Sequence, residues 1–207
     1  MDSNRSEPVP TRHRNGRQAH PPMAAKIVIA GGFGVGKTTA VTAISEIPPL
    51  TTEAALTAAS ASVDRLDGLP DKTTTTVALD FGRITVDRGL RLYLFGTPGQ
   101  DRFWFMWADL TEGALGALVI VDTRRLDHCY PAVDYFEKLG LPFVVAVNLF
   151  GGQLEHDLDD VRWALDIDHD TPLITFDARN RESVRDALLA VLRNSLERVA
   201  SGAPVGP

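Results

Sequence analysis

The sequence of 207 residues has a single cysteine, Cys129. A disulfide within the chain and a metal site built from several cysteines are therefore excluded. The sequence also lacks an apolar run of the ~18–20 residues that a membrane-spanning helix needs, and no apolar segment typical of a signal peptide stands near its N-terminus. These absences predict a cytoplasmic protein, because cysteines stay reduced there.

Positive charge is scarce: 21 Lys and Arg stand against 27 Asp and Glu, for a formal net charge of −6. This balance argues against a nucleic-acid partner, because nucleic-acid binders usually present a basic face. Residues 1–22 differ, since they hold four arginines and little that can be buried. We predict a disordered arm there, which is either an extension without function or a weak tether to acidic lipid or a partner. Peripheral recruitment to the inner face of the membrane would follow from the second reading.

Strand and helix patterns alternate between residues 23 and 200, which we predict to be one domain followed by a flexible tail at 201–207. Continuous apolar runs at 114–122 and 142–148 are typical of strands buried on both faces of a parallel sheet. Further strands are predicted at 26–30, 75–86, 90–95 and 172–176, and helices at 37–47, 128–139, 158–166 and 181–200.

This order predicts an α/β fold: a six-stranded, mostly parallel sheet with one antiparallel edge hairpin and helices on both faces. The hairpin turn is Asp87-Arg88-Gly89, and residues 50–72 form a long Thr- and Ala-rich connection. The last helix places its apolar residues on one face, at Val184, Leu188, Val191, Leu192, Leu196 and Val199.

A glycine-rich loop carries the strongest chemical signal. Residues 31–38 read Gly-Gly-Phe-Gly-Val-Gly-Lys-Thr and fit G-x-x-x-x-G-K-[ST], with a strand before the loop and a helix after it. Glycines let the backbone wrap a phosphate, and the loop amides and the helix N-terminus point at the anion. Lys37 is expected between the β- and γ-phosphates, and the hydroxyl of Thr38 is a ligand suited to Mg²⁺. The loop predicts triphosphate binding without identifying the base.

A second motif follows the third predicted strand. Residues 95–100 read Phe-Gly-Thr-Pro-Gly-Gln and resemble the D-x-x-G-Q segment of Ras-like small GTPases. The resemblance implies that Gly99 meets the γ-phosphate and that Gln100 orients the attacking water. It also aligns Thr76 with the Mg²⁺-binding threonine of the first switch, while Thr73, Thr74 and Thr75 remain alternatives.

The resemblance spans residues 26–200. Asn148 stands where this family has its base-reading N-K-x-D motif, and 177–179 stand where it has S-A-K. Together with Asp-Asp-Val-Arg at 159–162, these motifs are similar to the bacterial Ras-like GTPases of actinobacterial conservon operons, which are relatives of the gliding-motility polarity GTPases. That group implies a roadblock/LC7-type regulator and a sensor-kinase-like membrane protein as partners.

Three positions depart from the family pattern. Gly96 replaces the Asp that holds Mg²⁺ through water in this family, so either metal binding is weaker here or Asp122 or Asp80 substitutes. Gly151 replaces the Asp that reads guanine, which weakens the local basis for choosing GTP over ATP. Phe33 fills the third loop position, where its ring would crowd an arginine finger from a partner.

The predicted function is a slow GTPase switch that binds GTP, GDP and Mg²⁺ in a bacterial signalling complex. Lys37 and Gln100 are the expected catalytic residues, and Thr38 and Thr76 the expected metal ligands. The aromatic run 103–107 is either core beneath the switch or a docking patch that the switch controls, and Arg102 is a candidate arginine in cis. The expected nucleotide-binding residues are Gly31, Gly32, Phe33, Gly34, Val35, Gly36, Lys37, Thr38, Thr39, Thr76, Gly99, Asn148 and Ala178.

Two other functions fit the sequence less well. One is a nucleotide-sensing adaptor with little or no hydrolysis, which Gly96 and Gly151 favour. The other is an ATP-dependent phosphotransferase, for which no lid or acceptor motif is evident.

Overall fold

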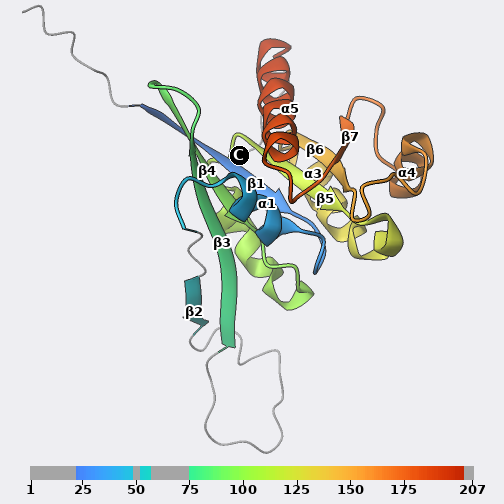
Figure 1. Ribbon diagram of the computed structural model, residues 1–207, viewed down its shortest axis with the longest axis horizontal. Coiled ribbons are helices and arrows are strands. Elements are labelled where there is room, and N and C mark those ends of the chain that lie inside the picture. The colour runs from blue at the N-terminus through green and yellow to red at the C-terminus, as the bar shows by residue number, and fades with distance from the viewer. Residues whose placement is uncertain (1–21, 49–51, 57–74, 203–207) are drawn as a thin grey trace, which may run out of the picture.

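The computed structural model describes residues 22–48, 52–56 and 75–202. Its centre is a seven-stranded sheet with the strand order β2-β3-β4-β1-β5-β6-β7 (Figure 1). Strand β3 is antiparallel to both β2 and β4, and the other neighbouring strands are parallel. The strands are β1 Met23–Ala30, β2 Thr52–Leu56, β3 Thr75–Thr85, β4 Leu90–Gly96, β5 Gly116–Val121, β6 Phe143–Asn148 and β7 Leu173–Phe176.

The predicted fold class is confirmed, with one correction to the sheet. All six predicted strands are present, but β2 adds a seventh strand within the segment that was predicted to be a connection. It pairs with the first half of β3, from Thr52 opposite Leu79 to Leu56 opposite Thr75. The sheet therefore has two antiparallel strand pairs instead of one. A short Thr- and Ala-rich segment carries little periodicity, so its partner strand decides its conformation.

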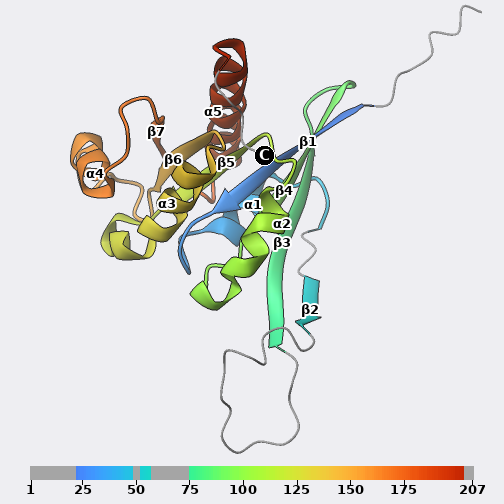
Figure 2. The ribbon, with the colours of Figure 1, turned by 180° about the vertical axis from the view of Figure 1, so that it is seen from behind.

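Helices cover both faces of the sheet (Figures 1 and 2). The α-helices are α1 Lys37–Ile44, α2 Trp107–Thr111, α3 Tyr130–Leu139, α4 Leu158–Leu165 and α5 Arg181–Ala200, with 3₁₀ segments η1 Asp101–Met106 and η2 Thr123–His128. Helix α1 ends three residues before its predicted end, because Ser45 is extended and its hydroxyl donates to the carbonyl of Ile47. The described elements run from Met23 to Ala200. The predicted arm, apart from residue 22, and residues 203–207 of the tail lie outside the described residues.

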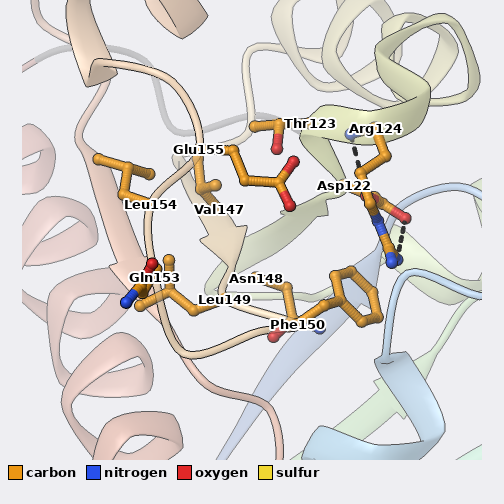
Figure 3. A pocket seen from close by; sticks show the side chains of 10 residues that line it. All are labelled: Asp122, Thr123, Arg124, Val147, Asn148, Leu149, Phe150, Gln153, Leu154 and Glu155. Carbon is orange, nitrogen blue, oxygen red and sulfur yellow. Dashed lines mark hydrogen bonds and ion pairs between the residues drawn. The ribbon is translucent and has the colours of Figure 1, made fainter.

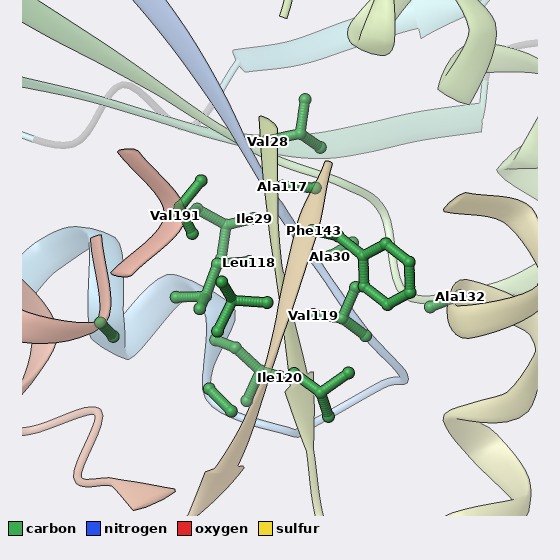
Figure 4. Packing of buried hydrophobic residues seen from close by; sticks show 14 of the residues in the cluster. Val28, Ile29, Ala30, Ala117, Leu118, Val119, Ile120, Ala132, Phe143 and Val191 are labelled. Carbon is green, nitrogen blue, oxygen red and sulfur yellow. The ribbon is translucent and has the colours of Figure 1, made fainter. Parts of the chain in front are cut away.

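The core is built around the central strands β1, β5 and β6. Every residue of β5 and β6 is buried, as the continuous apolar runs predicted. Figure 4 shows Val191 of α5 and Ala132 of α3 on opposite sides of these strands. Because β1, β4, β5 and β6 are parallel, their carboxyl ends meet at one edge of the sheet, where α/β folds of this kind bind ligands.

Helix α5 departs from the prediction in its second half. Leu188 is 2% exposed, but Leu196 is 63% exposed although both belong to the predicted apolar face. The last turns of α5 extend beyond the strands that its first half covers (Figures 1 and 2). The helical period was predicted correctly, but the face that packs on the sheet continues through Asn194 and Ser195, which are buried, so Leu196 points away from the sheet. Among the described residues, no helix has both the length and the apolar character needed to cross a membrane.

This difference predicts unequal costs for two identical substitutions. Leu188→Ala should lower the free energy of unfolding by about 2–5 kcal/mol, because it leaves a cavity in the core. Leu196→Ala, the matched control, should change it by less than about 0.5 kcal/mol. Urea unfolding followed by circular dichroism measures both, and equal losses would contradict the placement of α5.

Candidate nucleotide-binding site

The phosphate loop connects β1 to α1 at the carboxyl edge of the sheet. Gly31, Gly34 and Gly36 all have positive φ angles, of 133°, 77° and 108°. A Cβ on Gly31 would collide with the carbonyl oxygen of Ile120 on β5, so only glycine fits there. Gly36 caps α1, and the first amides of that helix have no side-chain cap. The loop thus presents the helix N-terminus that binds anions in phosphate loops.

Lys37 is folded back into its own loop. Its Nζ donates to the carbonyl oxygens of Gly31 at 2.8 Å and Gly32 at 2.7 Å. The side chain is 8% exposed, and burial lowers the pKa of Lys37 to about 8, although Asp80 and Cys129 oppose this shift. An ammonium group in this position needs a stronger anionic partner than two carbonyls, and a phosphate would supply one.

The segment after β4 closes over the loop. The amide of Thr97 donates to the carbonyl of Ile29 at 2.9 Å, which holds the start of the segment against β1. A Cβ on Gly99 would lie 2.7 Å from Nζ of Lys37, so glycine is required for this close approach. Gln100 follows on the exposed side of the loop. The structure thus places Gly99 directly beside Lys37.

A carboxylate from β3 occupies the space next to Gly96. Asp80 pairs with Gly96 across the antiparallel β3–β4 ladder, and a Cβ on Gly96 would lie 2.8 Å from Cβ of Asp80 and 3.1 Å from its Oδ2. The Oδ2 atom accepts a hydrogen bond of 2.6 Å from the hydroxyl of Thr38. Asp80 is 8% exposed. Two hard oxygen atoms therefore meet beside the loop, and this donor set suits Mg²⁺.

Asp122, the other predicted substitute, faces different partners. It accepts from Nε and Nη2 of Arg124 at 2.8 and 2.9 Å, and these hydrogen bonds hold its pKa below the usual value against the effect of burial (Figure 3). Arg125 approaches the same carboxylate at 3.6 Å. Because Asp122 is neutralised by arginines, Asp80 is the better placed of the two for a metal.

Asn148 joins three loops at the carboxyl edge. Its Nδ2 donates to the carbonyl of Val35 at 2.9 Å, and its Oδ1 accepts from the amide of Ala178 at 3.1 Å. The side chain is 7% exposed. Asn148 and Ala178, both predicted to bind nucleotide, therefore lie against the phosphate loop and hold it in place. Among the described residues, none besides its two chain neighbours lies within 4 Å of where a Cβ on Gly151 would be.

The structure separates Thr76 from the metal-binding candidates. Thr76 lies in β3 opposite Ala55 of β2, four residues before Asp80, which is about 13 Å along a strand. This conformation does not bring Thr76 to Thr38, so a metal role would require the start of β3 to leave the sheet. Thr75 opens the same strand. Thr73 and Thr74 lie outside the described residues, as does the side chain of Arg102.

The aromatic run is mostly packed against α3. Phe103 and Trp107 are buried, and Trp104 stacks on Trp107 with ring centroids 4.9 Å apart. Tyr135 of α3 meets the ring of Trp107 edge-on at 5.1 Å. Phe105 is 54% exposed. The run is therefore core along its buried side, with Phe105 as its exposed member.

The sequence did not point to Arg125, which lies near Gly34 in the phosphate loop. Two adjacent arginines directly after a buried strand were the available signal. Such a pair is common on solvated surfaces, and only the contact with the loop distinguishes Arg125.

The fold and the loop define a nucleotide-binding P-loop protein with a GTPase-like fold. The family described as "Conserved hypothetical ATP binding protein" matches residues 29–201, and the chain belongs to this family. An uncharacterized protein of Methanocaldococcus jannaschii is 31% identical over 125 residues, which cover 59% of this chain and 68% of that protein.

Solved structures with a similar fold include the cytosolic domain of the T. maritima FeoB iron transporter. Its apo form superposes with a TM-score of 0.58 and its GDP form with 0.59, each at 14% sequence identity. The matches cover 84% and 85% of this chain, and this chain spans 64% and 65% of the length of those chains. At this identity the likeness shows the fold.

The pKa of Lys37 predicts proton uptake on binding. Between pH 8 and 10.5 the native side chain has lost its proton in part, whereas the unfolded side chain keeps it, so the free protein should gain stability as pH rises through this window. A phosphate beside Lys37 restores the charged form. Binding of a triphosphate should therefore take up as much as about one proton at pH 9 and less at pH 7.5.

Calorimetry in buffers of different ionisation enthalpy measures this uptake. Lys37→Ala should bind no triphosphate while its fold is retained. Equal proton uptake at both pH values would contradict a lowered pKa of Lys37 in the free protein.

Proposed function

We propose that this protein is a molecular switch that binds GTP with Mg²⁺ and hydrolyses it slowly. The observation that carries the proposal is the meeting of Lys37, Thr38, Asp80 and Gly99 at one point of the phosphate loop. Lys37 would hold the β- and γ-phosphates, and the amide of Gly99 would contact the γ-phosphate. In hydrolysis, water attacks the γ-phosphorus and the bond to the bridging oxygen breaks, which gives GDP and inorganic phosphate.

Thr38 and Asp80 are the residues that would hold Mg²⁺. When bound there, the ion would supply positive charge that offsets the negative charge of the phosphates. Asp80 would replace the aspartate that Ras-like proteins carry at the position of Gly96, because the side chain of Asp80 fills the space that a side chain at position 96 would enter. The hydrogen bond from Thr38 orients the carboxylate in the free protein.

The switch would use the start of β3. Thr76 reaches the metal only if the first residues of β3 leave their pairing with β2. The γ-phosphate would favour that rearrangement through Thr76, and hydrolysis would release it. Gly99 would transmit the same signal to η1, whose Trp104 stacks on the buried Trp107.

Guanine is the proposed base, and adenine is the alternative. The GTPase-like fold and the similarity to conservon-type GTPases support guanine, whereas the description of the matched family names ATP. The exposed Gly151 offers no carboxylate to read guanine. Identification of the nucleotide that copurifies with the protein, followed by calorimetry with GTP and ATP, tests the proposal. A folded protein that binds neither would overturn it.

The remaining parts of the proposal concern partners. A roadblock/LC7-type regulator and a sensor-kinase-like membrane protein are proposed from the similarity to conservon-type GTPases, together with recruitment to the inner face of the membrane. Phe105, exposed next to the proposed switch, supports a docking surface there. The adaptor function without hydrolysis stays the second candidate, because Gln100 is exposed and makes no described side-chain hydrogen bond that orients it.

Gln100→Leu separates the switch from the adaptor. If Gln100 orients the attacking water, the single-turnover rate of hydrolysis should fall more than about tenfold, because removal of a group that assists proton transfer or orients water is costly. The affinity for a non-hydrolysable triphosphate should stay within about threefold. Glu197→Leu, at an exposed position of α5, is the control. Equal rates in both variants would favour the adaptor.

If Asp80 binds the metal, a carboxylate moved from position 80 to position 96 should take over its role. Asp80→Gly should raise the Mg²⁺ concentration needed for tight triphosphate binding by about tenfold to a hundredfold. Gly96→Asp alone should destabilise the fold, since its Cβ would meet that of Asp80. The double variant Asp80→Gly with Gly96→Asp removes this clash and should restore the Mg²⁺ dependence.

Titration of triphosphate affinity with Mg²⁺ and the Mn²⁺ electron paramagnetic resonance spectrum report the metal directly. Asp134→Asn, an exposed acidic position on α3, is the control. An unchanged Mg²⁺ requirement in Asp80→Gly would remove Asp80 from the site.

A further inference from the structure

The segment after β5 packs directly on the phosphate loop. A Cβ on Gly32 would lie 2.8 Å from the carbonyl oxygen of His128, at the end of η2. A Cβ on Gly34 would lie 3.3 Å from Nη2 of Arg125, in the middle of η2. A guanidinium group therefore lies beside the fourth residue of the loop.

Two arginines approach one carboxylate, and they share it unequally. Arg124 takes both oxygens of Asp122, at 2.8 and 2.9 Å, and its guanidinium lies 3.9 Å from the centre of the Phe150 ring (Figure 3). Arg125 reaches Asp122 with one nitrogen at 3.6 Å, and 46% of its side chain is exposed. A guanidinium has five N–H donors. Among the described residues, the Arg125 guanidinium has no other ion pair, so most of its donors are available to a further anion.

The backbone separates the two side chains. Arg125 has φ −149° and ψ 59°, which interrupts the 3₁₀ geometry of η2. Arg124 is directed to Phe150, while Arg125 is directed to Gly34. Neighbouring arginines in a regular 3₁₀ turn already point in different directions. The non-helical backbone angles of Arg125 accompany a side chain that lies beside the phosphate loop.

We propose that Arg125 is a phosphate-binding arginine that acts in cis on the β- and γ-phosphate oxygens of the nucleotide. This inference rests on the proposed function. The loop amides beside Gly34 are those that hold phosphate in P-loop proteins, and a guanidinium fork can bind two phosphate oxygens at once. Lys37 is a single point charge, so Arg125 adds the second cation that a triphosphate needs.

The exposed Phe33 supports an arginine that comes from within the chain. Its side chain is 63% exposed at the loop position next to Gly34. A bulky ring there obstructs an arginine that approaches from a partner through solvent. Arg125 reaches the loop from the side of β5 and η2, so it does not have to pass Phe33.

Arg125→Ala and Arg125→Lys test the proposal, with Arg88→Ala at the exposed β3–β4 turn as the control. Calorimetry in Mg²⁺ with GMP, GDP and a non-hydrolysable GTP analogue, and with the adenine series, gives the affinities. Arg125→Ala should lose about tenfold to a hundredfold in triphosphate affinity, less in diphosphate affinity and little in monophosphate affinity. Arg125→Lys should fall between, because it keeps the charge and loses the fork.

The outcomes are distinguishable. If wild type and Arg88→Ala bind the triphosphate and Arg125→Ala binds it equally well, Arg125 does not contact phosphate, while the proposed function stands. An equal loss for all three nucleotides would mean that Arg125 only supports the loop, and it would also overturn the proposal. Absence of triphosphate binding in wild type would reject the proposed function and this inference together.

Discussion

The ammonium group of Lys37, buried against the carbonyls of its own loop, is the interaction around which the site is arranged. Burial of a charge is costly unless anions or dipoles surround it. Gly31 and Gly32 supply two carbonyl acceptors, and Asp80 adds a nearby carboxylate. Gly99 has no side chain, which leaves room for Nζ of Lys37. The lowered pKa of Lys37 shows that these partners compensate burial only in part. A phosphate in the loop would complete the compensation, so the free protein is already organised for an anionic ligand.

The sheet provides the rigidity that this arrangement needs. Strands β5 and β6 and the second half of β1 are buried on both faces, and the carboxyl ends of these strands hold the phosphate loop, Asp122 and Asn148 at one edge. Asn148 fastens the loop to the end of β7 through hydrogen bonds to Val35 and Ala178. The proposed switch would rearrange in the antiparallel part of the sheet, where β2 pairs with the start of β3. A sheet whose parallel part stays in place while its antiparallel part rearranges would suit a protein that responds to the γ-phosphate.

Charge at the site comes from unusual places. The carboxylate beside Thr38 belongs to β3 and not to β4, and the second cation beside the loop belongs to the segment after β5. In the proposed site each would replace a group that Ras-like proteins take from elsewhere: the aspartate at the position of Gly96 and an arginine supplied by a partner. Physical chemistry requires oxygen ligands near the metal and positive charge near the phosphates. It does not require that a particular strand or chain supply them.

The sequence by itself determined the phosphate loop, the parallel core strands and the helix periods, because these depend on local spacing and on runs of apolar residues. Only the tertiary structure decided which face of α5 is buried, that β2 is a strand, and that Asp80 and Arg125 reach the loop. Asp80 faces Gly96 because of the register between antiparallel strands, and Arg125 faces Gly34 because η2 packs on the loop. Such contacts join residues 16 and 91 positions apart in the chain, and no local pattern encodes the distance between them.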